Sequence, residues 1–332
     1  MDSCFAFKRI MAASHRVCWQ VFAAGGPALA HHAGAIIHNT LYIHGGIDKK
    51  GSTSPCNKLY KLDLESPIWQ EVRVPGSPAL SHHACVVLHL RHLVFIGGWD
   101  GKARSSQVSV FDTEKECWMT MSTTGFPDGA GLSSHTANVL HNGNILIIGR
   151  EGSLRTQRRS GNAFMLGEDI AKGKFRYEDL PMGVASRSGH TANSVSSRLY
   201  IIGGRNDSSV EIHQGCKAAM VAPSVMEQLN LLVAKSTPMA KPPCGRKHHV
   251  SVAGSGAIFI HGGETFDGRS REPVGEMFLL TVTPTMKWYK LGTSPVGRQG
   301  HLCCASLDKV LIHGGLGARN ILHGDTYQLD LT

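Results

Sequence analysis

The stretch RKHHVSVAGSGAIFIHGG, residues 246–263, begins with a basic pair and a doubled histidine, has a third histidine near its end, and closes on two glycines. Its short apolar runs, separated by glycine and serine, are typical of two β-strands joined by a turn. Three histidines so close together would suit a metal site. They would also suit one copy of a repeated unit, and the rest of the sequence decides between these alternatives.

The closing glycines recur along the chain. Runs of β-branched and aromatic residues end in a glycine pair in LYIHGG (41–46), LVFIGG (93–98), LYIIGG (199–204), IFIHGG (258–263) and VLIHGG (310–315), and Arg150 replaces the second glycine in a sixth copy, ILIIGR (145–150). The first glycines are 52, 52, 54, 59 and 52 residues apart. A period of this size indicates six copies of one structural unit.

A histidine precedes each first glycine by 13 or 14 residues, at His32, His83, His135, His190, His249 and His301. Each unit can be divided into four strands by its alternation and turn residues. The first strand begins at the histidine, the second ends at the glycines, and the third alternates as in LYKLDL (59–64). The fourth holds Trp69, Trp118 or Trp288, with Phe175 or Tyr177 in the third unit.

This combination of histidine-led strand, double glycine, downstream aromatic residue and tryptophan resembles the kelch repeat family. The resemblance covers about Val17 to Thr332 and is greatest to short kelch domain-containing proteins that consist of a propeller alone. It implies an all-β fold, a six-bladed β-propeller in which each blade is a four-stranded antiparallel sheet around a central channel. We therefore expect residues 1–332 to form one domain and a monomer.

The ends of the chain indicate how the ring closes. The last unit stops at TYQLDLT (326–332), without a tryptophan strand, whereas RVCWQVF (16–22) places Trp19 13 residues before His32, much as Trp69 precedes His83 by 14. Residues 16–22 are therefore predicted to complete the last blade and remove its free edge. Residues 1–15 remain as an N-terminal extension.

The fourth unit is the longest and contains APSVMEQLNLLVAKSTP (222–238), which predicts a helical insertion. Pro223 suits a first helical turn, an apolar stripe follows, and Pro238 ends it. The helix would either cover the propeller rim or dock a partner such as a ubiquitin-ligase adaptor, through Met226, Leu229, Leu232 and Val233. No BTB domain or F-box is expected before the propeller, so a ligase role would need this helix or a separate adaptor.

Composition limits the class of protein. The chain has 34 lysines and arginines against 25 acidic residues, a net charge of +9, which falls short of the dense basic runs of nucleic-acid binders. We find no apolar stretch of signal-peptide or membrane-spanning length. Nine cysteines without a CxxC pair indicate reduced thiols and a cytoplasmic, possibly nuclear, protein.

The repeated histidines are interpreted first as structural groups that hydrogen-bond between neighbouring turns. The alternative is a metal-binding or metal-dependent propeller enzyme, centred on His44, His261 and His313 just before the glycines. Blades two to four carry Ile96, Ile148 and Ile202 there, which interrupts such a ring. The sequence also lacks GxSxG, HExxH and GxxxxGK[ST] motifs, so we predict no enzyme, no cofactor and no metal ligands.

The loops after the double glycines vary while the strands repeat, and with Arg150 they hold twelve basic and seven acidic residues. Turns entering first strands add arginines, which either make hydrogen bonds or salt bridges between blades or accept a carboxylate at the channel mouth, with Trp99 as an apolar wall. The predicted peptide-binding residues are Arg187, Arg205, Arg246, Arg298, Trp99, Arg150 and Arg319.

In similar kelch proteins such a surface binds acidic peptide segments or chain termini. The favoured function is therefore a non-catalytic protein-interaction module or adaptor, possibly the substrate-recognition subunit of a ubiquitin ligase. Nucleic-acid phosphate is a minor alternative, because Trp99 and Phe266 are the only aromatic residues interleaved with these basic loops.

Overall fold

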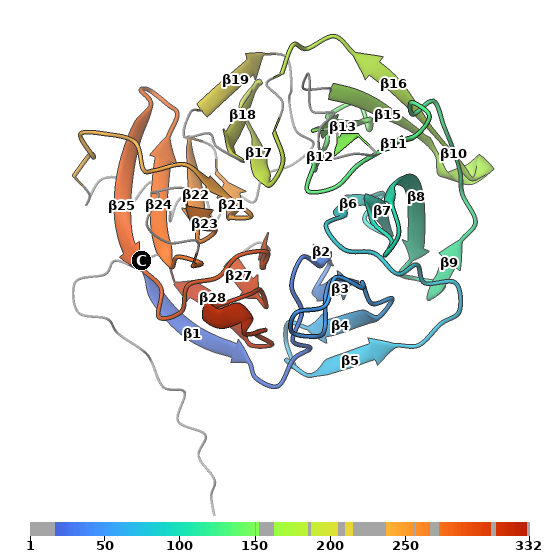
Figure 1. Ribbon diagram of the computed structural model, residues 1–332, viewed down its shortest axis with the longest axis horizontal. Helices are drawn as coiled ribbons and strands as arrows, with labels where there is room; N and C mark the ends of the chain where they lie inside the picture. The colour runs from blue at the N-terminus through green and yellow to red at the C-terminus, as the bar shows by residue number, and fades with distance from the viewer. Residues whose placement is uncertain are drawn as a thin grey trace, which may run out of the picture.

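The computed structural model describes residues 17–149, 151–152, 163–184, 187–204, 210–214, 237–254, 256–265, 272–306 and 310–330. Six small sheets stand side by side around a common centre, and the chain visits them in order (Figure 1). The fold is the predicted all-β, six-bladed β-propeller.

Each blade is an antiparallel meander whose strands pair in chain order. Blade 1 contains β2 (Ala33–Ile37), β3 (Thr40–His44), β4 (Leu59–Asp63) and β5 (Trp69–Val72). Blade 2 contains β6 (Ala84–Leu88), β7 (His92–Trp99), β8 (Arg104–Asp112) and β9 (Cys117–Met119). Blade 3 contains β12 (Thr136–Val139), β13 (Ile145–Ile148), β15 (Ala163–Asp169) and β16 (Lys174–Leu180), with β10 (Ser122–Thr124) added parallel to β16.

The other three blades follow the same plan. Blade 4 contains, within the described residues, β17 (His190–Val195), β18 (Arg198–Gly203) and β19 (Val210–Gln214). Blade 5 contains β21 (Val250–Ala253), β22 (Ala257–His261), β24 (Glu276–Thr281) and β25 (Lys287–Thr293). Blade 6 contains β26 (Leu302–Ala305), β27 (Val310–His313), β28 (Thr326–Asp330) and β1 (Cys18–Ala23).

Short elements complete the described residues. The two-residue strand β11 (Ala130–Gly131) pairs with β14 (Glu151–Gly152), and β20 (Arg246–Lys247) pairs with β23 (Glu264–Thr265). Two single 3₁₀ turns are present, η1 (Ile170–Lys172) and η2 (Ala318–Asn320).

The core lies between the blades. Among the described residues the buried apolar side chains form six clusters, and each cluster joins two neighbouring blades. Second strands such as Ile145–Ile148 and Val310–His313 are buried along their whole length, because both of their faces pack against a neighbouring blade. The continuous apolar runs that precede the glycines in the sequence are these buried second strands.

The closing strand is where the sequence predicted it. β1, from Cys18 to Ala23, pairs antiparallel with β28, and Trp19 lies opposite Leu329 (Figure 1). Trp19 is 4% exposed and packs against Tyr327, with ring centroids 5.5 Å apart. First and last strands of the chain therefore share one sheet.

The predicted helical insertion is not supported. The described residues form no α-helix, and of the segment 222–238 only residues 237 and 238 are described, neither of them helical. Met226, Leu229, Leu232 and Val233 therefore lie outside the described residues, as does the extension 1–15. Within the described part of the chain, no helix is long and apolar enough to cross a membrane.

Candidate functional site

A histidine of each blade packs against the first glycine of the blade before it. A Cβ on Gly45 would lie 2.9 Å from Cε1 of His83 and 2.3 Å from the carbonyl oxygen of Leu80. The same contact recurs at the other five interfaces, between Gly97 and His135, Gly149 and His190, Gly203 and His249, Gly262 and His301, and Gly314 and His32. The contact thus joins neighbouring blades, whereas the 13- or 14-residue interval from histidine to glycine lies within one blade and reflects the pairing of its first two strands, as of Ala33 with His44.

Four of these six histidines also make side-chain hydrogen bonds across the interfaces. Nε2 of His83 lies 3.1 Å from Nδ1 of His44, and Nε2 of His301 lies 2.9 Å from Nδ1 of His261. Threonine hydroxyls of the preceding blade serve His190 and His249, at 3.2 and 3.1 Å. The contacts agree with the structural role that the sequence favoured.

The metal alternative placed His44, His261 and His313 around a common centre, and the structure separates them. Each is buried at a different blade interface, with both ring nitrogens in contact with a polar partner. A tryptophan of the next blade packs on each ring, with centroids 4.7 to 5.2 Å apart: Trp118 on His44, Trp19 on His261 and Trp69 on His313. These three histidines therefore build interfaces and do not form a metal site together.

The residue before each repeated histidine lines the channel. These six residues, His31, His82, Ser134, Gly189, His248 and Gly300, all have positive φ, between 52° and 68°. The N–H of each donates to the carbonyl of its counterpart in the preceding blade, at 2.7 to 2.9 Å, and the bond from His31 to Gly300 closes the circle. Six backbone hydrogen bonds thus form a ring around the propeller axis.

Together with the repeated histidines, these six residues enclose a cavity of about 160 Å³. The rings of His31 and His82 stack at 3.9 Å, and His248 meets them edge-on at 4.9 and 5.8 Å. Burial lowers the pKa of His248 to about 3 and of His82 to about 4, and holds that of His31 well below its usual value. At neutral pH the channel is therefore lined by uncharged imidazoles.

Sequence reasoning missed His31, His82 and His248 as a group. The available signal was the doubled histidine of HHAGAI, HHACVV and HHVSVA in units one, two and five. The second histidine of each doublet recurs in all six units, whereas the first is present only in units one, two and five. The repeat therefore does not require the first histidine.

The three predicted arginines that are described, Arg187, Arg246 and Arg298, occupy equivalent positions and are buried. Each donates to the carbonyl of its own blade's first glycine, at 2.9 to 3.0 Å. Each also pairs with a carboxylate near the start of its blade's third strand: Glu211 at 2.5 Å, Glu276 at 3.1 Å, and Asp325 in a bidentate contact at 2.8 Å. These hydrogen bonds and salt bridges lie within one blade, and not between blades as the first alternative expected, and a role in peptide binding stays a prediction.

The other predicted peptide-binding residues lie on the loops. Trp99 is partly exposed, and its Nε1 donates to the carbonyl of Thr53 in blade 1, at 3.1 Å. Arg319 is exposed on η2. Arg150 and Arg205 lie outside the described residues.

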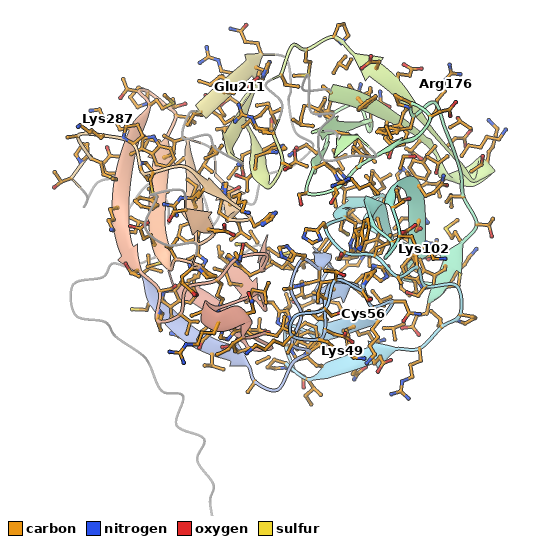
Figure 2. All side chains as sticks on the ribbon, in the orientation of Figure 1. Lys49, Cys56, Lys102, Arg176, Glu211 and Lys287 are labelled. Atoms are coloured by element: carbon orange, nitrogen blue, oxygen red, sulfur yellow. The ribbon has the colours of Figure 1, made fainter. Side chains whose placement is uncertain are left out.

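Exposed lysines stand on the loop that carries Trp99 and on the corresponding loop of blade 1. Lys49, Lys50 and Lys102 are exposed, and Lys49 and Lys102 lie over neighbouring blades 1 and 2 (Figure 2). The nearby Asp100 accepts hydrogen bonds from the backbone of Lys102 and Ala103, at 2.7 and 2.8 Å, so this carboxylate holds its own turn.

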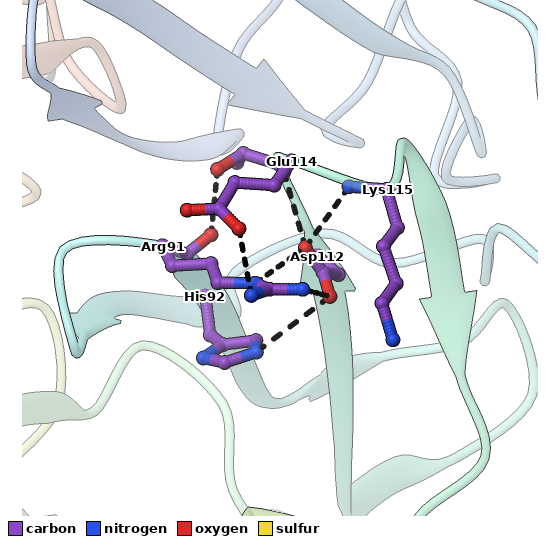
Figure 3. A network of polar contacts seen from close by, with 6 residues as sticks. Arg91, His92, Asp112, Glu114 and Lys115 are labelled. Carbon is purple, nitrogen blue, oxygen red and sulfur yellow. Dashed lines mark hydrogen bonds and ion pairs between the residues drawn. The ribbon is translucent and has the colours of Figure 1, made fainter.

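A second hollow, of about 550 Å³, lies at the outer edge of blades 2 and 3. Its charged groups bind one another: Arg91 makes a bidentate contact with Asp112, at 2.5 and 2.8 Å, and reaches Glu114 at 2.6 Å (Figure 3). Asp112 also accepts from the backbone N–H groups of Glu114 and Lys115, and the hydrogen bond from Arg91 lowers its pKa to about 2. The network holds the β6–β7 turn against the β8–β9 turn, which is a structural role.

The chain is similar to known proteins in both sequence and structure. The family model described as the KLHDC2/KLHL20/DRC7 Kelch-repeats domain matches residues 11–158 and 184–332. Kelch domain-containing protein 9 of Homo sapiens is 32% identical over 309 residues, 87% of this chain and 88% of that protein, and human kelch domain-containing protein 3 is 23% identical over 90% of this chain and 80% of that protein. The solved structure titled "Structure of YjhT" superposes with a TM-score of 0.65 over 91% of this chain and 94% of that one, at 16% identity.

Proposed function

The chain belongs to the kelch-repeat family of β-propellers, and from this we propose that it is a non-catalytic protein-interaction module that binds acidic or C-terminal peptide segments on its loop face. The loop face is the side of the propeller that carries the loops after the double glycines. Membership of this family suggests an interaction module, and the charges on the loop face support the finer specificity.

The observation that supports an acidic ligand is the set of exposed cations on loops of different blades. Lys49 and Lys50 stand on blade 1, Lys102 on blade 2 and Arg319 on blade 6. Two acidic residues on this face are engaged elsewhere: Glu264 is buried and pairs with Lys247 at 3.4 Å, and Asp100 holds its own turn. Cations spread over a rigid rim attract an acidic segment and orient it during encounter.

The buried arginines support the loop face from within. Because Arg298 holds both a glycine carbonyl and Asp325, it ties the end of β27 to the start of β28, and Arg187 and Arg246 do the same in their blades. Replacing one of them would remove a charged partner from a partly buried carboxylate, which destabilises the protein. A test of peptide binding is therefore better made on the exposed lysines.

We expect selection from a library of peptides with free C-termini to enrich for Asp and Glu or for a required terminal carboxylate. The double variant Lys49→Glu/Lys102→Glu should weaken the selected peptides at least tenfold, because two cations of the loop face become anions. Isothermal titration of each purified variant would measure this.

The control is Arg176→Glu/Lys287→Glu, which changes the net charge equally but on exposed residues of outer strands (Figure 2). Equal weakening in both double variants, or a library that selects no acidic or terminal feature, would contradict the proposal.

A monomeric state, a cytoplasmic or nuclear location and a place in a ubiquitin ligase stay predictions. The residues proposed to dock an adaptor lie outside the described part of the chain.

A further inference from the structure

Three imidazoles meet inside the channel, from blades far apart in the sequence. His31 comes from blade 1, His82 from blade 2 and His248 from blade 5, and one ring nitrogen of each lies within 4.8 Å of the other two. Each is partly exposed toward the cavity, so an ion in the channel can reach it. We propose that His31, His82 and His248 bind one divalent transition-metal ion of the zinc, nickel or copper class.

The ligand chemistry suits such an ion. Imidazole nitrogen is a preferred ligand of zinc, nickel and copper, and three histidines with an open fourth position is a recurring zinc site. Carboxylate oxygens, which calcium and magnesium prefer, do not contribute to this histidine group within the described residues.

Neighbouring groups orient two of the rings. Oγ of Ser81 lies 3.1 Å from Nδ1 of His82, which leaves Nε2 of His82 for the metal. Oγ of Ser134 lies 3.4 Å from Nε2 of His248, across the channel from blade 3. The hydroxyl of Ser134 therefore stands where it can hydrogen-bond a water molecule at the fourth position.

Binding an ion requires the rings to move from their present positions. A tetrahedral zinc site with Zn–N bonds of 2.0 to 2.1 Å needs nitrogen atoms about 3.3 Å apart, closer than the widest separation here. His31 and His82 must turn out of their stacked arrangement to reach it. His248 and His31 each lean over a glycine of the preceding blade: a Cβ on Gly189 would lie 2.7 Å from the ring of His248, and one on Gly300 2.5 Å from that of His31.

The backbone gives an independent reason to assign a purpose to these side chains. His31, His82 and His248 have φ values of 55°, 55° and 52°, a left-handed conformation that costs energy for any residue with a Cβ. The equivalent positions in blades 4 and 6 are Gly189 and Gly300, for which this conformation carries no steric cost. Histidine is therefore not what the turn itself requires at these positions.

Positive charge near the channel opposes the ion. Lys247 and Arg104 both act to lower histidine pKa values here, which shows that their fields reach the site. Lys247 is paired with Glu264 at 3.4 Å, which partly offsets its charge. The three imidazoles must therefore supply the affinity by direct coordination.

The test uses chelator-treated full-length protein titrated with ZnCl₂ alone, followed by calorimetry and by the thermal unfolding midpoint. We expect one ion per chain and a raised midpoint. His82→Gly and His248→Gly should each weaken zinc binding by more than about 100-fold, the upper end of what second-shell changes cause. Because glycine already occupies the equivalent turn in blades 4 and 6, both variants should fold, and circular dichroism checks this.

His141→Gln removes an exposed imidazole outside the channel and should leave zinc binding unchanged. Titration with Co²⁺ gives a second reading, because a tetrahedral three-histidine site produces visible d–d absorption that the glycine variants should lose. The proposal is wrong if the wild-type protein takes up less than one equivalent of zinc. It is equally wrong if folded His82→Gly and His248→Gly bind zinc as tightly as the wild type.

Discussion

At the scale of single residues, the histidine of one blade packs against the first glycine of the preceding blade, in the space where a larger residue would place its Cβ. The first glycines have φ between 62° and 101°, and the histidine ring fills the volume that a Cβ would take. The contact fixes histidine and glycine against each other across the blade interface, while the interval of 13 or 14 residues within each unit is set by the pairing of that blade's first two strands.

Gly45→Ala should destabilise the protein by more than about 3 kcal/mol, because the new methyl group meets both the carbonyl of Leu80 and the ring of His83. Gly51→Ala is the matched control: its φ is 73°, similar to the 65° of Gly45, but nothing lies within 4 Å of the added Cβ. We expect it to cost only about 1 kcal/mol from the backbone conformation. Urea unfolding of both variants measures the difference, and equal losses would show that the histidine contact contributes nothing.

Single residues also differ in whether their roles could be predicted from the sequence. The repeated histidines and glycines could be found because they recur at a fixed interval. His31, His82 and His248 could not be assigned to one site, because blades 1, 2 and 5 meet only when the ring closes. The sequence also left two roles open for Arg298, because its partner Asp325 is 27 residues away in the chain.

At the scale of elements, the closing strand β1 supplies one side of the cluster between blades 5 and 6. Trp19 lies within this cluster together with Phe259, Met277 and Leu329. The sequence predicted the strand because a missing tryptophan strand at one end matched a surplus one at the other. Element boundaries were less certain, since the observed strand runs from Cys18 to Ala23 and not from 16 to 22.

Trp19→Ala should lower the free energy of unfolding by about 3 to 5 kcal/mol, the usual cost of truncating a buried aromatic residue to alanine. Gln20→Ala, on the same strand but partly exposed, should change it by no more than about 0.5 kcal/mol. Thermal and urea unfolding check both values. A small effect of Trp19→Ala would mean that the ring closes without help from this strand.

At the scale of the whole molecule, stability should depend on pH through histidines buried around the ring. Burial lowers the pKa of His44, His190 and His261 to about 3. In the unfolded chain these residues titrate near pH 6.5. Between these values the unfolded state binds more protons than the folded state, so stability is full above about pH 6.5 and falls as the pH decreases toward 3.

Each such histidine should cost about 2 kcal/mol by pH 5. Carboxylates contribute little in this range, because Asp112 and Asp325 have lowered pKa values and lose their contribution only at lower pH. We therefore expect the urea midpoint to drop steeply between pH 6.5 and pH 5. A midpoint that stays constant over this interval would show that the histidines take up protons without unfolding the ring.

The circle of backbone hydrogen bonds around the channel has an electrostatic consequence. In a helix, peptide dipoles point the same way along an axis and add up to a net field at each end. Here the six N–H groups donate in one rotational sense around a closed circle, so the dipole components along the circle cancel. Each of these amide donors is already bonded to a carbonyl of the preceding blade, which leaves none of the six for an anion in the channel. The preference of the channel for one ion over another is thus set by side chains, at the six positions where this sequence has His, His, Ser, Gly, His and Gly.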